Sequence, residues 1–382
     1  MAVKIFIAGD VIPKDRTTPL FKDKKTSEIF GNMLPIINDS DIKIVNLEAP
    51  VICNSPTPIR KSGPNLYTNK ETVEVLKDAG FNVITLANNH FRDQGDNGIS
   101  DTINVITSQH LAYVGGGHNY NEARKILYQK VNNSIIAIIN FCEKEFSIAT
   151  NEQGGSNPLD LIAIYNDICE AKKNANYILI ISHGGVEHYQ LPTPRMKKEF
   201  RFFIDAGADA VINHHQHCFS GYEVYNGKPI FYGLGNFSFD WNGKRNSTWN
   251  KGYAVTILLD KKIDFTIHPY IQCDEQPGII CKNESYYSNE ISCLNQIIQN
   301  DKVLKDSFKK MALSNEREYI FRLSSFKSRL IRGLYKRMLI AQLYPQSKLY
   351  ITKNLLTCES HREVLLEILN NILELKNERH RL

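Results

Sequence analysis

The chain has 382 residues, of which 46 are Lys or Arg and 41 are Asp or Glu, and its formal net charge is +5. Single hydrophobic cores rarely grow beyond roughly 250–300 residues, so this length predicts one large domain with a smaller appendage. The mild positive charge does not by itself indicate a nucleic-acid partner, and the eight cysteines form no C-x-x-C pair. No apolar run is long enough to span a bilayer, and the first one is too short for a signal peptide, which predicts a cytoplasmic protein.

The first third of the chain predicts a repeated strand and helix pattern. The predicted strands are residues 3–8, 42–45 and 82–87, and the predicted helices are about residues 27–37, 69–79 and 99–108. Each strand ends in side chains that can bind a ligand. Asp10 follows the first strand, Asn46 and Glu48 end the second, and Asn89 with His90 follow the third. Because open α/β sheets bind ligands at the carboxyl ends of their strands, we expect these side chains to meet at one edge.

The middle of the chain continues this pattern with more antiparallel pairing. We predict a hairpin at residues 126–131 and 134–141, helices at 159–173 and 194–206, and strands at 177–181, 208–212, 221–225, 253–259 and 263–270. The strand at 177–181 leads into His183, with Glu187 and His188 just beyond. The glycine run at 115–117 lacks the lysine and the serine or threonine of a phosphate-binding loop, so we interpret it as a turn.

The strand predicted at 208–212 is followed by Asn213-His214-His215-Gln216-His217. Neutral imidazole is the commonest side-chain ligand of Zn, Mn, Fe and Cu in proteins, and residues two apart can reach one metal in an extended or turning backbone. A solvated loop is the alternative interpretation of such a run. Together with the carboxylates and the amide at the other strand ends, the cluster favours a metal site. Two cations there, about 3.5–4 Å apart, would share a bridging carboxylate and a water ionised near neutral pH.

Residues 86–95, LANNHFRDQG, resemble the A-N-N-H-x-x-D-x-G motif of the CapA family of capsule and poly-γ-glutamate synthesis proteins, within the calcineurin-like metallophosphoesterase superfamily. The resemblance covers about residues 3–270 in the right order, including residues 9–10, 46–50, 182–187, 207–217 and 227–237. It implies an α/β fold: a four-layer αββα sandwich of metallophosphoesterase type at residues 1–272. A basic helical C-terminal region would follow at residues 273–382.

The resemblance also implies a site for one or two divalent cations, with Mn, Fe and Zn as the candidates. Its ligands would be Asp10, Glu48, Asn89, His183, His215 and His217, with Glu48 as the bridging carboxylate. His90 would stand beside the substrate and protonate the leaving oxygen. The substrate pocket would be formed by Asn46, Glu187, His188, Arg195 and Asn236. For Glu187, His188 and Arg195, a place on a helix surface is the alternative.

One position departs from the superfamily pattern. The usual start is D-x-H, whereas Asp10-Val11-Ile12 places isoleucine where the histidine would be. One metal would therefore lose a ligand, which leaves open whether one or two cations bind.

The region beyond about residue 275 lies outside the resemblance. Between residues 301 and 340 Lys and Arg outnumber the acids, and apolar residues recur at helical spacing from Leu323 to Met338. Such a basic amphipathic helix can lie on an anionic membrane. We favour the alternative, a helix packed on the main domain with a solvated basic face, because most amphipathic stripes are core stripes. A final helix is predicted at residues 359–376.

Two functional hypotheses follow. The first is a metal-dependent, phosphoesterase-like hydrolase with a metal-activated water, acting in capsule, poly-γ-glutamate or cell-surface polysaccharide biosynthesis. The second is a non-catalytic assembly subunit of a polymer synthesis complex that docks through its basic helical tail. The expected partners are an anionic or phosphorylated polymer precursor and a membrane-associated capsule synthase, so peripheral contact with the membrane is compatible with a cytoplasmic location. The scattered aromatic residues form no stacking platform, and we expect no nucleic-acid partner.

Overall fold

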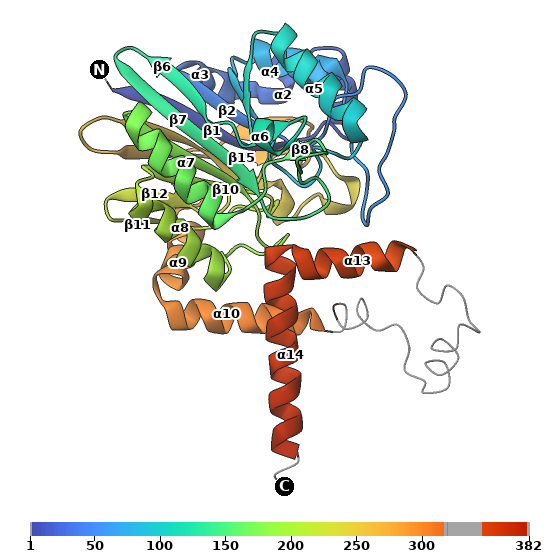
Figure 1. The fold of residues 1–382 in the computed structure, drawn as a ribbon. Coiled ribbons are helices and arrows are strands. Elements are labelled where there is room, and N and C mark those ends of the chain that lie inside the picture. The colour runs from blue at the N-terminus through green and yellow to red at the C-terminus, as the bar shows by residue number, and fades with distance from the viewer. Residues whose placement is uncertain (1, 317–318, 320–345, 380–382) are drawn as a thin grey trace.

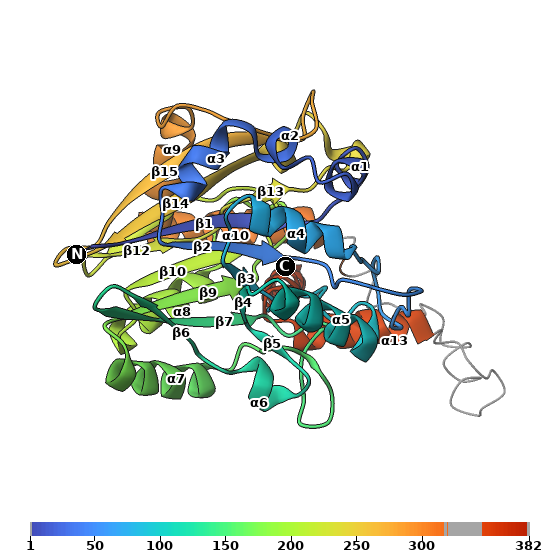
Figure 2. The same ribbon diagram turned by 90° about the horizontal axis from the view of Figure 1, so that it is seen from above.

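A computed structural model describes residues 2–316, 319 and 346–379, and the apolar stripe from Leu323 to Met338 lies outside these residues. Two β-sheets pack face to face, and helices cover the outer face of each (Figures 1 and 2). The four-layer αββα arrangement expected from the sequence is therefore confirmed. No helix within the described part of the chain is both long and apolar enough to cross a membrane.

The first sheet has the strand order β16-β15-β14-β1-β2-β3-β4, with β13 also paired to β1. Its strands are β1 (Val3–Val11), β2 (Ile42–Leu47), β3 (Val83–Thr85), β4 (Ala112–Val114), β13 (Asn236–Ser238), β14 (Lys251–Leu259), β15 (Asp264–Gln272) and β16 (Ile279–Cys281). The strands from β1 to β4 run parallel, whereas β14 pairs with β1 in the antiparallel direction. Strand pairing continues past residue 272 into β16, and the division of the chain into two domains at that residue stays a prediction.

The second sheet has the order β11-β12-β10-β9-β7-β6. Its strands are β6 (Leu127–Val131), β7 (Ser134–Cys142), β9 (Tyr177–His183), β10 (Ala210–His214), β11 (Tyr222–Tyr225) and β12 (Lys228–Phe231). The central strands β7, β9, β10 and β12 are parallel, so their carboxyl ends reach one edge. Two short strands, β5 (Gly116–Gly117) and β8 (Gly155–Ser156), pair beside that edge. The glycine run at 115–117 thus belongs partly to a strand.

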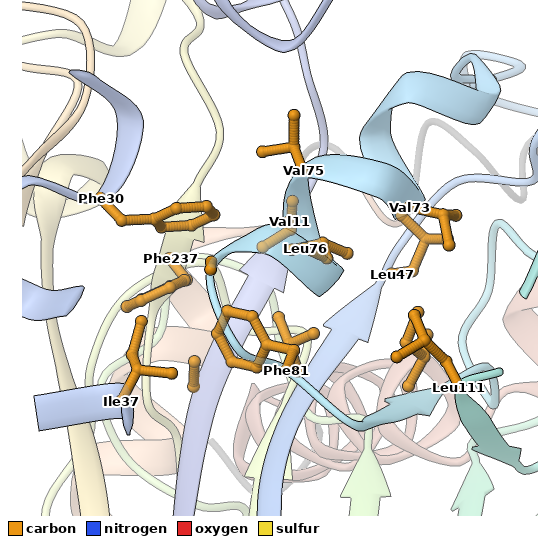
Figure 3. Packing of buried hydrophobic residues seen from close by; sticks show 14 of the residues in the cluster. Val11, Phe30, Ile37, Leu47, Val73, Val75, Leu76, Phe81, Leu111 and Phe237 are labelled. Carbon is orange, nitrogen blue, oxygen red and sulfur yellow. The ribbon is translucent and has the colours of Figure 1, made fainter. Parts of the chain in front are cut away.

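The central strand β1 shows why the apolar runs predict buried strands. Ile5 and Ile7 point into the core between the two sheets, whereas Phe6 and Ala8 pack beneath the helices on the outer face. Successive side chains of a strand point to opposite faces, and a strand buried on both faces is apolar throughout. In the outer core, the rings of Phe30 and Phe237 stack with their centroids 5.6 Å apart (Figure 3).

The helices divide between the two outer faces. The first sheet is covered by α1 (Thr17–Lys22), α2 (Thr26–Phe30), α3 (Leu34–Asn38), α4 (Lys70–Asp78) and α5 (Gly95–Ser108), and the second by α7 (Leu161–Asn174) and α8 (Pro194–Ala206), with α6 (Tyr120–Ala123) nearby. The single helix predicted over about 27–37 is wrong. Gly31, at φ 49°, and Pro35 interrupt it, and a short 3-10 turn separates α2 from α3.

The described part of the C-terminal region is helical beyond β16, as predicted, and packs against one end of the sandwich (Figure 1). It comprises α9 (Ser288–Gln299), α10 (Asp301–Ser314), α13 (Gln346–Thr357) and α14 (Glu359–Arg379). The apolar cluster at its centre includes Phe308, Leu355 and Ile368, and it contacts Val186 and Tyr189 of the sandwich. The described part of this region therefore shares a hydrophobic contact with the loop that follows β9.

The start of α7 offers a test of local stability. Asp160 precedes this helix, and its Oδ1 accepts hydrogen bonds from the backbone amides of Ile162 and Ala163, both at 3.0 Å. We expect Asp160→Ala to lower the free energy of unfolding by about 1 kcal/mol, because two amides lose their acceptor. Asp160→Asn keeps an acceptor and should cost less. Urea denaturation of the two variants measures the difference, and equal losses would contradict this role.

Candidate metal centre

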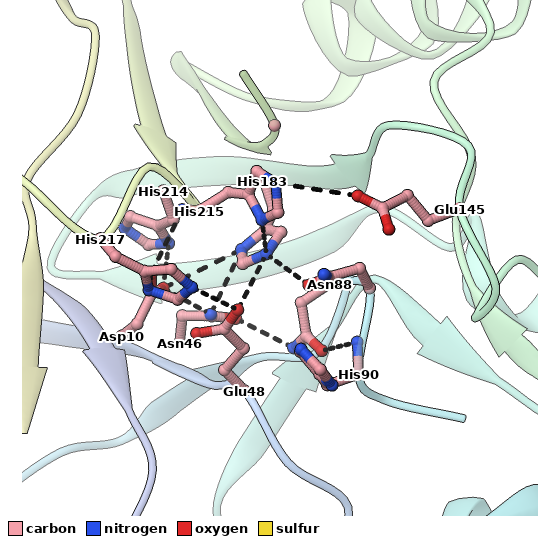
Figure 4. Close-up of polar contacts among 12 residues, drawn as sticks. Asp10, Asn46, Glu48, Asn88, His90, Glu145, His183, His214, His215 and His217 are labelled. Atoms are coloured by element: carbon pink, nitrogen blue, oxygen red, sulfur yellow. Dashed lines mark hydrogen bonds and ion pairs between the residues drawn. The ribbon is translucent and has the colours of Figure 1, made fainter. Parts of the chain in front are cut away.

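The carboxyl edges of both sheets converge on one polar cluster (Figure 4). The first sheet contributes Asp10 from β1, Asn46 from β2 and Glu48 just beyond it, and the second contributes His183 from β9 and His214 from β10. All five side chains are buried. The backbone of β1 packs closely against Gly235, since a Cβ on Gly9 would stand 1.9 Å from the carbonyl oxygen of Gly235. Only glycine permits that approach.

The predicted ligands lie within short distances of one another. Glu48 Oε1 is 3.4 Å from His183 Nε2 and 3.8 Å from His217 Nε2. His183 Nε2 is also 3.1 Å from Asn89 Oδ1 and 3.1 Å from His215 Nδ1. Asp10 Oδ2 is 3.8 Å from His217 Nδ1. The six residues predicted as metal ligands are thus brought together.

Three groups of ligand atoms could each hold a metal ion, with every atom of a group within 4.8 Å of the others. The groups are Asp10 with His183 and His214, Glu48 with His183 and His215, and Asp10 with Glu48 and His217. They share His183, Asp10 and Glu48, so the cluster is continuous. Carboxylate oxygen and imidazole nitrogen suit Mn, Fe and Zn.

The state of Glu48 fits a cation at this place. Its side chain is fully buried, and neither carboxylate oxygen has a hydrogen-bond partner among the described residues. Burial, reinforced by the neighbouring carboxylate of Asp10, raises the pKa of Glu48 well above its ordinary value. An unpaired buried carboxylate is costly, whereas one that coordinates a metal is compensated. The donor set therefore fits a divalent cation.

The histidines are held in the form that binds metals. Burial lowers the pKa of His217 to about 4, and burial together with the nearby His215 ring holds the pKa of His183 well below its usual value. Both rings are consequently neutral at pH 7. Asn236 Oδ1 lies 2.9 Å from His217 Nδ1, so that nitrogen carries the proton and Nε2 is left to coordinate.

The loop after β10 has an unusual backbone. His215 has φ 89° and His217 has φ 56°, backbone angles that residues other than glycine rarely adopt. The preceding Asn213 anchors this loop, because its Nδ2 donates to the carbonyl oxygens of Gly184 and Tyr232. The backbone amide of His215 donates to Asp10 Oδ2 at 3.2 Å. Such strain concentrates at functional sites, where surrounding contacts hold the residues in place.

Ile12 packs among apolar side chains that adjoin the cluster. It is buried in an apolar group with Ala49, Phe239 and Trp249, and the Trp249 ring lies 4.7 Å from that of His217. A different imidazole stands beside Asp10: His214 Nδ1 is 3.9 Å from Asp10 Oδ1, and no residue that the structure describes forms a hydrogen bond with its buried Nε2. The chain thus offers a fourth imidazole to the cluster.

His90 lies next to the cluster in a charged pocket of its own. Its Nδ1 is 2.6 Å from Asp93 Oδ2 and 3.2 Å from the ammonium nitrogen of Lys61, which also pairs with Asp93. The backbone amide of His90 donates to Asn88 Oδ1. These contacts fix the ring and leave Nε2 as the nitrogen available to a ligand.

A cavity of about 480 Å³ opens beside these residues. The sandwich side of the cavity includes Lys61, Asn89, His90, Glu145, Glu187 and His188, and the C-terminal side includes Met311, Asn315, Tyr319, Asn354 and His361. The Tyr189 hydroxyl and Asn354 Oδ1 are buried there, and neither has a hydrogen-bond partner within the described part of the chain. The C-terminal helices thus form one wall of the cavity that borders the candidate metal centre.

The residues predicted for the substrate pocket fall into three positions. Glu187 and His188 line the cavity, as expected of substrate contacts. Asn46 and Asn236 instead contact predicted metal ligands: Asn46 Nδ2 donates to Asp10 Oδ1 at 2.7 Å, and Asn236 orients His217. Arg195 is not among the described residues that line the cavity. It pairs with Glu143, Glu199 and Glu363.

Several residues of the site were not singled out from the sequence. Asn88 and Asp93 belong to the motif at 86–95, and His214 belongs to the histidine run, so a pattern was present for each. Lys61 and Glu145 come from loops whose sequence carries no such pattern. Only the tertiary fold brings them to the cavity.

Four layers with a carboxylate, amide and imidazole cluster at the carboxyl ends of two facing sheets define an αββα protein with a candidate metal centre. Residues 4–241 match the family described as bacterial capsule synthesis protein PGA_cap. This match covers more than half of the 382 residues, so the chain belongs to that family, and the family predicted from the motifs is confirmed.

Curated relatives agree with this assignment. The chain is 34% identical over 251 residues to capsule biosynthesis protein CapA of Bacillus anthracis, covering 63% of this chain and 61% of that protein. It is 38% identical over 245 residues to PGA biosynthesis protein CapA of Bacillus subtilis, covering 63% and 64%. The chain therefore spans less than two thirds of the length of either relative.

Among solved structures, a phosphatase of Mycoplasma pneumoniae aligns with 76% of this chain and 97% of its own, at 17% identity and a TM-score of 0.47. A putative 5'-nucleotidase of Staphylococcus aureus aligns with 78% and 58%, at 12% identity and a TM-score of 0.43. Both similarities are too distant to assign an activity.

Proposed function

We propose that this chain is a metal-dependent, phosphoesterase-like hydrolase that acts in the synthesis of a capsule, poly-γ-glutamate or another cell-surface polymer. The observation that carries the proposal is Glu48, a fully buried carboxylate that accepts no hydrogen bond from the residues described and is set among imidazoles beside a cavity. The polymer context is supported by the family and by the names of the two relatives. The substrate we propose is an anionic or phosphorylated polymer precursor, and the partner a membrane-associated capsule synthase.

In this proposal the cation ligands are Asp10, Glu48, Asn89, His183, His215 and His217, with His214 as a further donor beside Asp10. A bound divalent cation supplies Lewis-acid polarisation of a phosphoryl oxygen and makes a water-derived nucleophile available near neutral pH. Asn46 and Asn236 orient Asp10 and His217 through hydrogen bonds. Mn, Fe and Zn remain the candidates, and the number of cations is part of the test below.

His90 would move the proton in this mechanism. Asp93 and Lys61 hold its Nδ1 side, so Nε2 faces the substrate and protonates the leaving oxygen as the bond to phosphorus breaks. Glu187 and His188 on the cavity wall would contact the remainder of the substrate. The ammonium group of Lys61 adds positive charge near the oxygen that becomes the leaving group.

We expect wild-type protein purified without added metal to retain a divalent cation and to hydrolyse a phosphomonoester or phosphodiester in Mn. His215→Ala should lose both properties. His90→Ala should keep its metal but lose about 100-fold or more in kcat, because only the proton donor is removed. Metal analysis and assays with p-nitrophenyl phosphate and bis-p-nitrophenyl phosphate measure these effects. The exposed His118→Ala is the matched control.

A second function remains a candidate because Ile12 occupies the position of a superfamily ligand. In that case the chain is a non-catalytic assembly subunit of a polymer synthesis complex that keeps the fold and docks through its basic helical tail. Metal retention without turnover of either ester, in wild type as in His90→Ala, would support this second function and contradict the hydrolase.

A further inference from the structure

A second group of metal-binding side chains lies where the C-terminal helices meet the sandwich. Glu145 follows β7, Cys358 joins α13 to α14, and His361 lies in the first turn of α14. Their ligand atoms are all within 4.8 Å of one another, and Cys358 Sγ is 4.0 Å from Glu145 Oε1. None of the three belongs to the ligand set of the first centre.

The three donors form a set that suits zinc. Cys358 and His361 are three residues apart at the start of a helix, a spacing that places both on one face. Thiolate, imidazole and carboxylate are the ligands that Zn²⁺ takes in proteins, and three of them leave a fourth position for water. Cys358 is almost fully buried, so a cation there would be shielded from competing solvent.

Outer contacts hold two of the donors in place. Tyr319 Oη lies 2.9 Å from His361 Nδ1 and fixes the orientation of the ring. The Cys358 thiol is 3.5 Å from Glu143 Oε2, a carboxylate that also accepts from the backbone amide and the hydroxyl of Ser360. The Tyr319 contact is typical of a metal-binding histidine, whose second ring nitrogen is commonly held by a hydrogen-bond partner. The thiol contact with Glu143 places the sulfur in the metal-free protein and is given up when the thiol loses its proton.

The charge around the group favours an additional cation. Five carboxylates lie in this junction: Glu143, Glu145, Glu199, Glu359 and Glu363. Arg195 pairs with Glu143, Glu199 and Glu363, Lys144 pairs with Glu359, and Glu145 lies beside the His215 ring. Burial, with further contributions from Glu143 and Glu363, raises the pKa of Glu199 to about 7. The five carboxylates outnumber the two cationic side chains, Arg195 and Lys144, and a divalent ion would offset the excess.

We propose that a divalent cation of the zinc type binds between Glu145, Cys358 and His361 and fastens the C-terminal helices to the edge of the candidate active site. On binding, the Cys358 thiol loses its proton to solvent and the sulfur coordinates as thiolate. Glu145 links the two places, because its Oε1 is also 3.8 Å from His215 Nε2. The cation therefore stabilises the wall of the cavity that the sandwich cannot form alone. This proposal does not depend on hydrolysis.

Cobalt tests the site directly in the full-length chain, after the native metal has been removed with a chelator and the chelator dialysed away. The first centre offers only nitrogen and oxygen ligands, so thiolate-to-cobalt charge transfer in the near ultraviolet reports on a cysteine. We expect this absorption in wild type during a titration to several equivalents of Co²⁺, and its displacement by Zn²⁺. Cys358→Ser should lose it, and His361→Gln should weaken binding by on the order of 100-fold.

Two comparisons keep the test decisive. The exposed thiols are removed in a Cys53→Ser, Cys293→Ser double variant, which should retain the absorption because these cysteines lie outside the group. Zn²⁺ should raise the Tm of wild type by more than that of Cys358→Ser, since only wild type gains this ligand contact. No charge transfer in wild type, equal charge transfer in Cys358→Ser, or its loss in the double variant would overturn the proposal.

Discussion

Glu48→Gln should abolish metal retention and lower hydrolysis by at least about a thousand-fold, yet leave the metal-free protein more stable than wild type. The amide cannot replace a carboxylate shared between ligand groups, and without the cation the polarisation of the substrate is lost. In metal-free wild type, however, the buried Glu48 carboxylate accepts no hydrogen bond from the described residues, and the His183 ring 3.4 Å away is neutral. Removing its charge should therefore raise the free energy of unfolding by about 1–3 kcal/mol.

Metal analysis after gel filtration and urea denaturation in the presence of a chelator at pH 8 measure the two effects. Glu170→Gln, which neutralises an exposed acid, is the control and should change neither. Opposite effects on metal binding and on metal-free stability distinguish a ligand from a residue that merely supports the fold. Wild-type metal content in Glu48→Gln, or a metal-free variant less stable than wild type, would rule out the assigned role.

Arg195→Met should lower the free energy of unfolding by about 3–5 kcal/mol, because it leaves three partly buried carboxylates without their cation. The guanidinium contacts Glu143 Oε1 and Glu199 Oε2 at 2.5 Å each, and Glu363 Oε2 at 3.0 Å. Burial alone would raise the pKa of Glu143, but Arg195 and Ser360 hold it below its ordinary value. The methionine fills similar space and carries no charge.

The pH dependence of this loss has a definite sign. Glu199 has a pKa raised to about 7, so its ionisation destabilises the folded chain as the pH rises from 4.5 through 7. Without Arg195 the cost of ionising Glu199 grows. The loss of unfolding free energy in Arg195→Met, relative to wild type, should therefore be larger at pH 8 than at pH 5.5. Lys251→Met, which breaks an exposed pair with Glu290, should cost at most about 1 kcal/mol. Similar losses of unfolding free energy in Arg195→Met and Lys251→Met would contradict this role of Arg195.

The sequence predicted most of the sandwich because its strands are apolar on both faces. Strand β1 is such a segment. The helix at Pro194–Ala206 could be predicted for a different reason, because its apolar residues recur at helical spacing up to a clear stop. The segment from Thr26 to Asn38 could not be predicted as well. There the apolar spacing is helical, but Gly31 adopts a positive φ where a Cβ would come within 2.8 Å of the Ile279 carbonyl oxygen. That contact comes from a strand 248 residues later and leaves no local signal.

The residues of the candidate site likewise divide into those that could be predicted from the sequence and those that could not. Asp10, Glu48 and His183 could be found because parallel strands deliver their last residues to one edge. Arg195 shows where this reasoning fails: its partner Glu363 lies 168 residues away, on a helix outside the family match. Glu145 and Lys61 reach the cavity through loops, whose paths depend on the whole fold.

The cavity wall formed by the C-terminal helices bears on how relatives can be compared. The family match ends at residue 241, whereas Asn354 and His361 line the same cavity as His90. Two members with identical metal ligands can thus present different chambers to their substrates if their tails differ. A chimaera that exchanges tails would need to carry the matching surface, Val186, Tyr189 and Arg195, from the same parent. Substrate preference within the family would then depend on the tail and its docking surface together.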